Sequence, residues 1–276
     1  MRERLRGVAN AVQSRLTLHP ASRVAQWECL LQELYTANRR DVISALVRSL
    51  QEASWNHPYK PHLRALVESR SFIEIIEQLF NDLSASDLRD LVSGNLDPAL
   101  DRADNRARDR EFEFFVAAIC RRAGLEVQLA EPDVLYVSAR GTRSIAAKRL
   151  SSRRTVRANV SKAAEQIERS SHPGIICLDI TRLVEPKYEY IMYWRQGADF
   201  LPSRFPAFER SEFREVFARK RSDLVRGIVL RVVFPLLSEG LRLGSREEWY
   251  AVGVPGDDAV ERNEFLRTIL GGLKGV

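Results

Sequence analysis

The first third of the chain carries the hydrophobic spacing of α-helices. Segments 23–37 (RVAQWECLLQELYTA) and 71–80 (SFIEIIEQLF) repeat apolar residues at intervals of three and four, which places those residues on one face of a helix. Ser84 followed by Asp87 has the pattern of a capping box at the start of a further helix. We therefore expect residues 1–95 to form an all-helical region that packs against the rest of the chain or holds a protein partner.

A different pattern begins after the polar, charged connection NLDPALDRADNRARDRE. An apolar helix that Gly124 ends is followed by a short strand, a hairpin with Gly141 at its turn, an amphipathic helix and a buried strand. These elements are expected, in that order, at residues 111–124, 125–130, 132–150, 157–170 and 174–181. Mixed strands and helices of this kind predict an α/β domain in residues 96–276, with a central mixed sheet flanked by helices.

The pattern is weaker beyond Thr181. EYIMYW (189–194) suits a strand or the start of a helix, and RSEFREVFARKRSDLV (210–225) suits a charged amphipathic helix. The apolar run GIVLRVVFPLL (227–237) predicts a buried strand, and EEWYAVGV (247–254) predicts the last one. Each prediction rests on hydrophobic periodicity alone.

Charge adds a candidate partner to this picture. The formal net charge is +6, from 43 Lys and Arg against 37 Asp and Glu, and basic residues concentrate between Arg140 and Arg169. Such a segment attracts phosphate groups, so a polyanion such as nucleic acid is one expected partner. A solvated basic face without a partner explains the same residues equally well.

Other classes of protein find little support. The three cysteines and four histidines have no spacing typical of a zinc site, and scattered cysteines in apolar segments predict reduced thiols in the cytoplasm. The basic N-terminus lacks the apolar core and cleavage site of a secretory signal. The longest apolar run is too short to cross a membrane, so we expect no membrane span.

The hairpin carries the candidate chemistry. Side chains alternate across a strand, so Ala146 and Lys148 point to the same face. With the turn centred on Arg140 and Gly141, Asp133 falls directly opposite Lys148, where the two side chains can interact. Carboxylates bind hard divalent cations through oxygen, and such a cation lowers the pKa of a bound water. This arrangement suits the hydrolysis of a phosphodiester bond.

A single carboxylate rarely holds a cation, so a second one is needed. Glu113 lies in the apolar helix before the hairpin, and Glu111 is a neighbouring candidate. A carboxylate in such surroundings needs a cation or a hydrogen-bonding partner.

Four segments in this order, FEFFVAAICRRAGLEV, EPDVLYVSARGTRSIAAKRL, KAAEQI and GIICLDIT, resemble the core of the PD-(D/E)xK nuclease superfamily over residues 109–182. The resemblance implies a restriction-endonuclease-like fold and hydrolysis of nucleic acid, with DNA as the expected substrate and Mg²⁺ or Mn²⁺ as cofactor. It also suggests a role in defence against foreign DNA, with partner proteins for targeting. Association of several copies of the chain remains open.

The resemblance assigns roles to individual residues. Glu113 and Asp133 would be the metal ligands, Lys148 would orient the attacking water or stabilise the phosphate, and Gln166 matches a supporting helical glutamine. We further expect four basic side chains that follow the hairpin to contact the nucleic-acid backbone: Arg149, Arg153, Arg154 and Arg157.

The chain departs from the superfamily pattern at Ala146, where Asp or Glu is expected two residues before the lysine. Three explanations stay open: a substitution that removed the acid, a branch that takes its ligands from other carboxylates, and a fold retained only for binding. The last would make the protein a non-catalytic adaptor for nucleic acid or a protein partner.

Simpler roles also account for the same residues. Lys148 could reach solvent from the sheet edge, and Asp133 could cap the turn into its strand. Glu113 could pair with Arg110 on the helix surface. Asp179, at the end of an apolar strand, suits a cap for the turn at Thr181 better than a metal ligand.

Overall fold

The computed structural model describes residues 1–51, 58–94, 96, 106–184, 192–193, 223–237, 243–252 and 265–267. Two compact units share the chain and alternate along it. The first consists of Met1–Glu111, Lys187–Gly197 and Val233–Arg246, and the second of Phe112–Pro186, Ala198–Val232 and Glu247–Val276.

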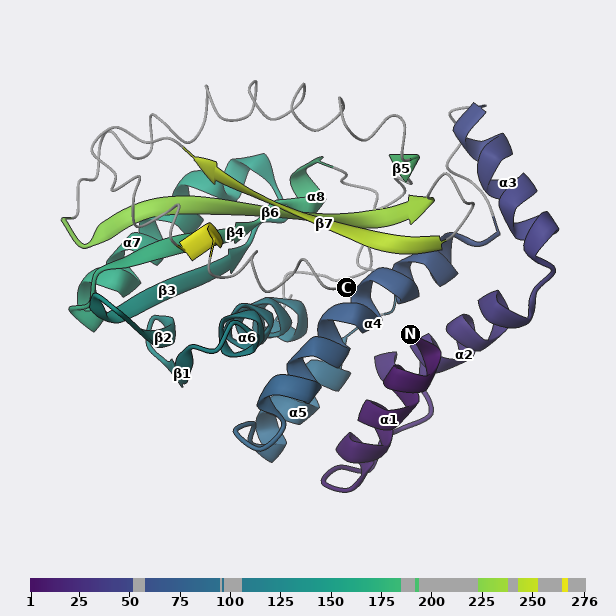
Figure 1. Ribbon diagram of the computed structural model, residues 1–276, viewed down its shortest axis with the longest axis horizontal. Coiled ribbons are helices and arrows are strands. Elements are labelled where there is room, and N and C mark those ends of the chain that lie inside the picture. The colour runs from purple at the N-terminus through teal and green to yellow at the C-terminus, as the bar shows by residue number, and fades with distance from the viewer. Residues whose placement is uncertain are drawn as a thin grey trace. The chain divides into compact units, whose positions relative to one another are not determined.

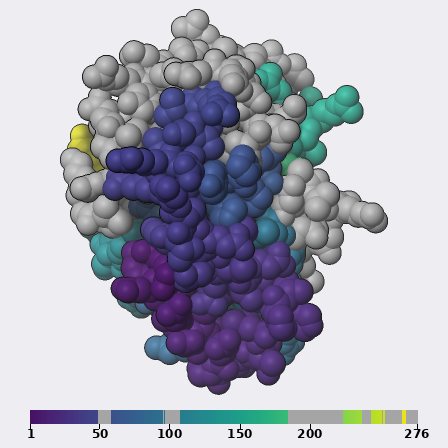
Figure 2. All heavy atoms as spheres, turned by 90° about the vertical axis from the view of Figure 1, so that its right-hand side faces the viewer, coloured from purple at the N-terminus to yellow at the C-terminus, as the bar shows by residue number. Residues whose placement is uncertain are grey.

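The described part of the chain before residue 95 is helical, as predicted. Its helices are α1 (Arg2–Gln13), α2 (Arg23–Thr36), α3 (Arg39–Gln51), α4 (Lys60–Leu79) and α5 (Ala85–Val92) (Figure 1). The capping box is present at α5, where the Ser84 hydroxyl accepts from the Asp87 amide and the Asp87 carboxylate accepts from the Ser84 amide. Figure 2 shows α1 and α2, coloured purple, at the surface that faces the viewer.

The long helix α4 forms the centre of this unit. It packs against α1 and α2. Its apolar residues recur at helical spacing, and Phe72, Ile76 and Leu79 among them are buried. The ring of Phe72 lies 5.7 Å from that of Trp27 on α2, centroid to centroid, and Trp27 is fully buried. Burial of these large apolar side chains stabilises the helical unit.

Helix α6 (Arg106–Arg122) runs from the first unit into the second, since the boundary between the units falls between Glu111 and Phe112. All its residues from Phe112 to Cys120 are buried except Glu113, which is half-buried. The helix ends near Gly124, whose φ of 83° lies in the left-handed region that glycine tolerates. The prediction of an apolar helix stopped at this glycine is confirmed.

The strands of the chain form a mixed sheet, of which β1 to β4 lie wholly in the second unit. The strands are β1 (Glu126–Ala130), β2 (Asp133–Ser138), β3 (Gly141–Arg149), β4 (Gly174–Asp179), β5 (Met192–Tyr193), β6 (Val225–Leu237) and β7 (Leu243–Val252). β5, the end of β6 from Val233 and the start of β7 up to Arg246 are assigned to the first unit. The strand order is β1-β2-β3-β4-β6-β5, and β7 pairs with β6. β1, β2 and β3 are antiparallel neighbours, whereas β3, β4 and β6 are parallel. The predicted α/β class with a mixed sheet is therefore confirmed.

Parallel strands β3 and β4 are connected by a helix, as their direction requires. The connection consists of a short 3₁₀ turn, η2 (Arg153–Thr155), and helix α7 (Val156–Ser170). α7 packs on both strands through its stripe of Val156, Val160, Ala163 and Ile167. The short helix α8 (Thr181–Val184) follows β4.

The hairpin register differs from the predicted one. Ser138 pairs with Gly141 and Val134 with Ile145, so the turn is centred one residue earlier than expected, and Asp133 falls opposite Ala146 instead of Lys148. Gly141 causes the difference, because with a φ of 92° it closes the turn as the first residue of β3.

The later strand predictions are confirmed where the structure describes them. The run GIVLRVVFPLL lies in β6, EEWYAV lies in β7, and Met192–Tyr193 form a short strand. Most of the helix expected at residues 210–225 lies outside the described residues. All three cysteines are free thiols. Among the described helices, none combines the length and apolar character that a membrane span requires.

Candidate functional site

Asp133 and Lys148 form an ion pair in the sheet of the second unit. The Lys148 Nζ atom donates to Asp133 Oδ2 at 2.8 Å, and the backbone amide of Ala147 donates to the same oxygen at 2.8 Å. The two residues are diagonal neighbours across β2 and β3, a separation that a long lysine side chain can span. Only 14% of the lysine and 8% of the aspartate side chain are exposed, so the pair is shielded from solvent.

The electrostatic surroundings of Asp133 bring in Glu113. Burial raises the pKa of Asp133 to about 7, the positive charge of Lys148 opposes that rise, and the negative charge of Glu113 adds to it. Charges act this strongly only at short range. Glu113 on α6 therefore lies within electrostatic range of Asp133.

Gln166 on α7 adds a third oxygen donor beside this pair. Its Nε2 atom donates to the carbonyl of Pro132 at 3.1 Å, next to Asp133 in the chain. The residue is buried, and its Oε1 atom has no hydrogen-bond partner. A buried acceptor without a partner is costly, whereas a bound cation or a water would satisfy it.

Ala146 lies inside this arrangement. It is fully buried, sits opposite Asp133 when the hairpin register is continued by one residue, and shares a face with Lys148. A methyl group therefore occupies the position at which the superfamily pattern expects a carboxylate. Within the described residues, no group of three or more His, Cys, Asp or Glu side chains is placed to hold a metal ion.

The oxygen ligands that these side chains offer are of the type that a hard cation binds. Glu113 and Asp133 offer carboxylate oxygens, and Gln166 offers an amide oxygen, which are the ligand types that Mg²⁺ accepts in proteins. Mg²⁺ also keeps several waters when proteins bind it through only one or two carboxylates. The donor set therefore fits the predicted cofactor, with fewer acids than the superfamily pattern implies.

The four basic residues predicted to contact nucleic acid have different surroundings. Arg153 and Arg154 on η2 and Arg157 in the first turn of α7 are exposed. Arg149, at the end of β3, instead points to Asp179, with its Nε atom 3.7 Å from Asp179 Oδ2, and only 16% of its side chain is exposed. Three of the four side chains are thus accessible to a phosphate backbone.

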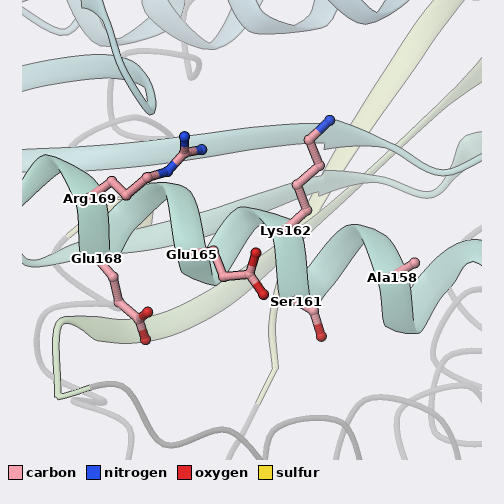
Figure 3. A pocket seen from close by; sticks show the side chains of 6 residues that line it. All are labelled: Ala158, Ser161, Lys162, Glu165, Glu168 and Arg169. Carbon is pink, nitrogen blue, oxygen red and sulfur yellow. The ribbon is translucent and has the colours of Figure 1, made fainter.

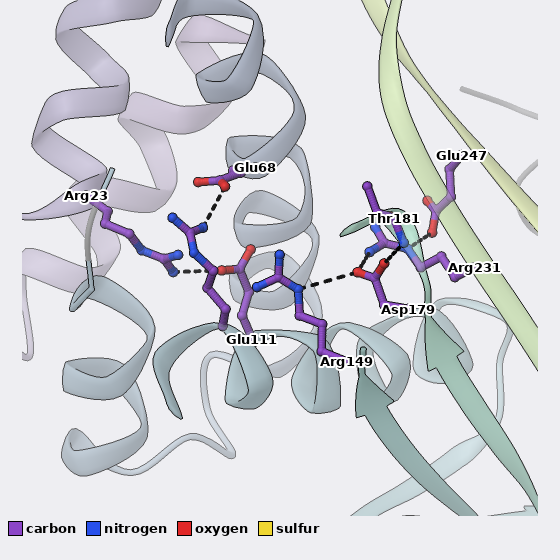
Figure 4. Close-up of polar contacts among 9 residues, drawn as sticks. Arg23, Glu68, Glu111, Arg149, Asp179, Thr181, Arg231 and Glu247 are labelled. Atoms are coloured by element: carbon purple, nitrogen blue, oxygen red, sulfur yellow. Dashed lines mark hydrogen bonds and ion pairs between the residues drawn. The ribbon is translucent and has the colours of Figure 1, made fainter. Parts of the chain in front are cut away.

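The sequence did not predict a buried ionic network across the sheet. Arg149, Asp179 and Arg231 are direct neighbours on β3, β4 and β6, so their side chains lie on the face opposite to that of Lys148. The Arg231 Nη1 atom is 3.2 Å from Asp179 Oδ2, and its Nε atom is 2.5 Å from Glu247 Oε1 on β7 (Figure 4). The guanidinium also lies 4.2 Å from the centroid of the Phe115 ring on α6.

A signal for this network existed in the sequence. Arg231 interrupts an apolar run that predicts a buried strand, and a buried charge needs a partner. The sequence predicts Asp179 as a cap for the turn at Thr181, and its Oδ1 atom does accept from the Thr181 amide at 2.9 Å. Its second oxygen binds Arg231.

An open hollow lies on the exposed side of α7 (Figure 3). Ala158, Ser161, Lys162, Glu165, Glu168 and Arg169 line it. Its two basic and two acidic side chains balance in charge, and Arg169 forms an ion pair with Glu131 at 2.8 Å. A polyanion gains little from such a surface, so the hollow is not a continuation of the exposed arginines.

Comparisons with protein-family models, with curated proteins and with solved structures find no match to this chain. The function is therefore inferred from the residues of the site and their geometry.

Proposed function

We propose that the second unit is a metal-dependent nuclease of the restriction-endonuclease-like type, which hydrolyses phosphodiester bonds in DNA. The observation that supports this most directly is the set of groups that act on the Asp133 carboxylate. Its carboxylate is held by Lys148 and the Ala147 amide, and the charge of Glu113 acts on it. Two acids and a lysine on a rigid hairpin and helix are the groups that the chemistry requires.

In this proposal each residue has a distinct task. Glu113 and Asp133 would hold Mg²⁺ or Mn²⁺, and Gln166 Oε1 would be a further oxygen ligand from the protein. The bound ion would supply a water of lowered pKa and neutralise charge on the phosphate. Lys148 directs its ammonium to the attacking water or to the phosphate oxygens, where negative charge increases during the reaction.

A bound cation would also stabilise the ionised form of Asp133. A carboxyl whose pKa is about 7 is half-protonated at neutral pH, and a divalent ion favours the ionised form because opposite charges attract. Ion binding would therefore release a proton from Asp133, and the ion's affinity would rise with pH across neutrality.

Arg153, Arg154 and Arg157 are the proposed contacts to the DNA backbone. They are exposed on η2 and in the first turn of α7, which follow β3, the strand that carries Lys148. The three free cysteines suit a protein of the reducing cytoplasm. A role in defence against foreign DNA, with protein partners, rests on the superfamily resemblance.

The test is cleavage of plasmid DNA in Mg²⁺ or Mn²⁺ by the wild-type protein and by Ala146→Glu. We expect slow cleavage by the wild type and faster cleavage by Ala146→Glu, because the added carboxylate would face Asp133. Lys148→Ala should abolish cleavage, whereas Lys162→Ala, which removes an exposed lysine of α7, should not.

Two outcomes would contradict the proposal. No cleavage by either the wild type or Ala146→Glu, together with no metal binding in calorimetry, would exclude the nuclease. Unchanged cleavage by Lys148→Ala would exclude the role of that residue.

A second candidate function is a non-catalytic adaptor that binds DNA or a protein partner. The buried methyl of Ala146 and the lack of a three-acid cluster among the described residues favour it. DNA binding without cleavage, with cleavage gained only by Ala146→Glu, would identify the wild-type protein as this adaptor.

A further inference from the structure

Lys148 carries a shielded ammonium group with one polar partner. The neighbouring positions on its face of the sheet are Ala146 on β3 and Ile176 and Leu178 on β4, and these three side chains are apolar and fully buried. Among the described residues, Asp133 is the single group to which the Lys148 Nζ atom donates, at 2.8 Å. One carboxylate therefore balances the charge of this lysine.

The same contact occupies an oxygen of the carboxylate. Asp133 Oδ2 accepts from Lys148 Nζ and from the backbone amide of Ala147, both at 2.8 Å. A carboxylate oxygen has about two lone-pair sites, so these two donors fill Oδ2. On this oxygen, the ammonium takes the place that a metal ion would otherwise have.

A divalent cation and the paired ammonium are poorly compatible at Asp133. A cation on either carboxylate oxygen would stand beside Nζ, where only 14% of the lysine and 8% of the aspartate side chain are exposed. Like charges repel more strongly where water is largely excluded, and the surrounding apolar side chains cannot accept a hydrogen bond from the ammonium. Binding of a cation therefore requires Lys148 to turn toward solvent.

Ala146 makes this competition unavoidable. It shares a face with Lys148 and lies opposite Asp133 when the hairpin register is continued by one residue. A carboxylate at position 146 could hold the ammonium while Asp133 holds the cation. A methyl group cannot, so the lysine and the cation depend on the same carboxylate.

We propose that Lys148 is an internal counter-ion that keeps the site closed: it occupies Asp133 in the metal-free protein, and Mg²⁺ or Mn²⁺ displaces it toward solvent. The inference rests on the proposed metal site, because the cation of that site is the competitor. The contacts that carry it all lie within the second unit. Displacement also frees the ammonium for the phosphate, so metal binding and the release of the lysine occur together.

The test measures how fast individual lysines of the full-length protein react with an acylating reagent, with and without saturating Mn²⁺, by mass spectrometry of the peptides. We expect Lys148 to react slowly without Mn²⁺ and at least about tenfold faster with it, since a minor open conformation is typically populated at about 10% or less. Lys162, which is exposed on α7, is the matched control, and its rate should not change.

Two variants sharpen the result. Asp133→Asn removes the carboxylate charge, so Lys148 should react fast without Mn²⁺ and no faster with it. In calorimetry at pH 8, Lys148→Met should bind Mn²⁺ about tenfold more tightly than the wild type, because no ammonium has to leave. Lys162→Met should bind it as the wild type does.

Two outcomes would overturn the displacement while leaving the metal site intact. One is Mn²⁺ binding to the wild type with no change in the reaction rate of Lys148, and the other is Mn²⁺ binding by folded Lys148→Met that is no tighter than that of the wild type. Absence of Mn²⁺ binding in the wild type, Lys148→Met and Ala146→Glu alike would overturn the metal site, and the inference with it.

Discussion

Asp133 and Asp179 are two buried carboxylates in one sheet with opposite surroundings. Asp133 has one ammonium partner, Lys148, and a second acid, Glu113, whose charge raises its pKa. Asp179 has two guanidinium groups within 4 Å, those of Arg231 and Arg149. The positive charge near Asp133 does not balance the carboxylates of Asp133 and Glu113, whereas two guanidinium groups compensate the charge of Asp179.

The difference indicates which carboxylate is available for chemistry. The oxygens of Asp179 are occupied by Arg231 and the Thr181 amide, and its charge is compensated, so it suits a structural role. The carboxyl of Asp133 gains most from an added cation, because burial and a neighbouring acid disfavour its charge. Burial alone does not distinguish the two residues, whereas the balance of charged partners does.

The largest expected effect comes from removing Arg231, which compensates the charge of Asp179. Arg231→Met removes the guanidinium partner of Glu247 and the nearer of the two guanidinium groups beside Asp179, so we expect the free energy of unfolding to fall by about 3–5 kcal/mol. Urea denaturation at pH 7 measures it. A loss below about 1 kcal/mol, the range of an exposed pair, would show that the network is not needed to keep these acids folded.

The second prediction concerns the pH dependence that Asp133 imposes. Its pKa rises from 3.8 to about 7 on folding, so between these pH values the folded protein holds a proton that the unfolded chain releases. The stability that this group contributes is complete below pH 4 and is lost as pH rises to about 7, with a slope of at most about 1.4 kcal/mol per pH unit.

Asp133→Asn removes that titration. Urea denaturation between pH 4 and 8 should show a flatter dependence for the variant than for the wild type, with Glu77→Gln, which changes an exposed pair, as a control. Parallel curves for the wild type and Asp133→Asn would mean that the Asp133 pKa is not raised.

The third prediction separates Arg149 from the exposed arginines. Reversing the charges of Arg153 and Arg154 should reduce the slope of log affinity for DNA against log salt by about 2, since each phosphate contact contributes about 0.9. Arg149→Gln should leave that slope unchanged and lower the unfolding free energy instead, because Arg149 pairs with Asp179. An equal slope in all three proteins would exclude the predicted backbone contacts.

The comparison also shows what the sequence could predict. Alternation along β3 was enough to place Lys148 and Ala146 on one face, and the order of segments was enough to predict the mixed sheet. The hairpin register was wrong by one residue at the turn, because the pattern does not tell whether Gly141 belongs to the turn or to the strand. Lys148 reaches Asp133 in either register because its side chain is long.

The Asp179 network could not be predicted in the same way. It requires β3, β4 and β6 to be neighbours, although 45 residues separate Asp179 from Val225, the start of β6. The position of Arg231 within an apolar run indicates a need for a partner, but not which acid provides it. Partner choice depends on strand order, and hydrophobic periodicity does not contain strand order.

The smallest effect is expected at Gln166. It tests whether an uncharged oxygen beside Asp133 also takes part in binding a cation. Gln166→Met loses the bond to the Pro132 carbonyl and also removes the unpartnered Oε1 atom, so the unfolding free energy should change by less than about 1 kcal/mol. Mn²⁺ affinity should fall in Gln166→Met and rise in Gln166→Glu, because a carboxylate attracts the cation more strongly than an amide does. Calorimetry on the three proteins distinguishes this from a packing role. If Mn²⁺ affinity follows stability instead of the charge at this position, Gln166 only supports the turn before Asp133.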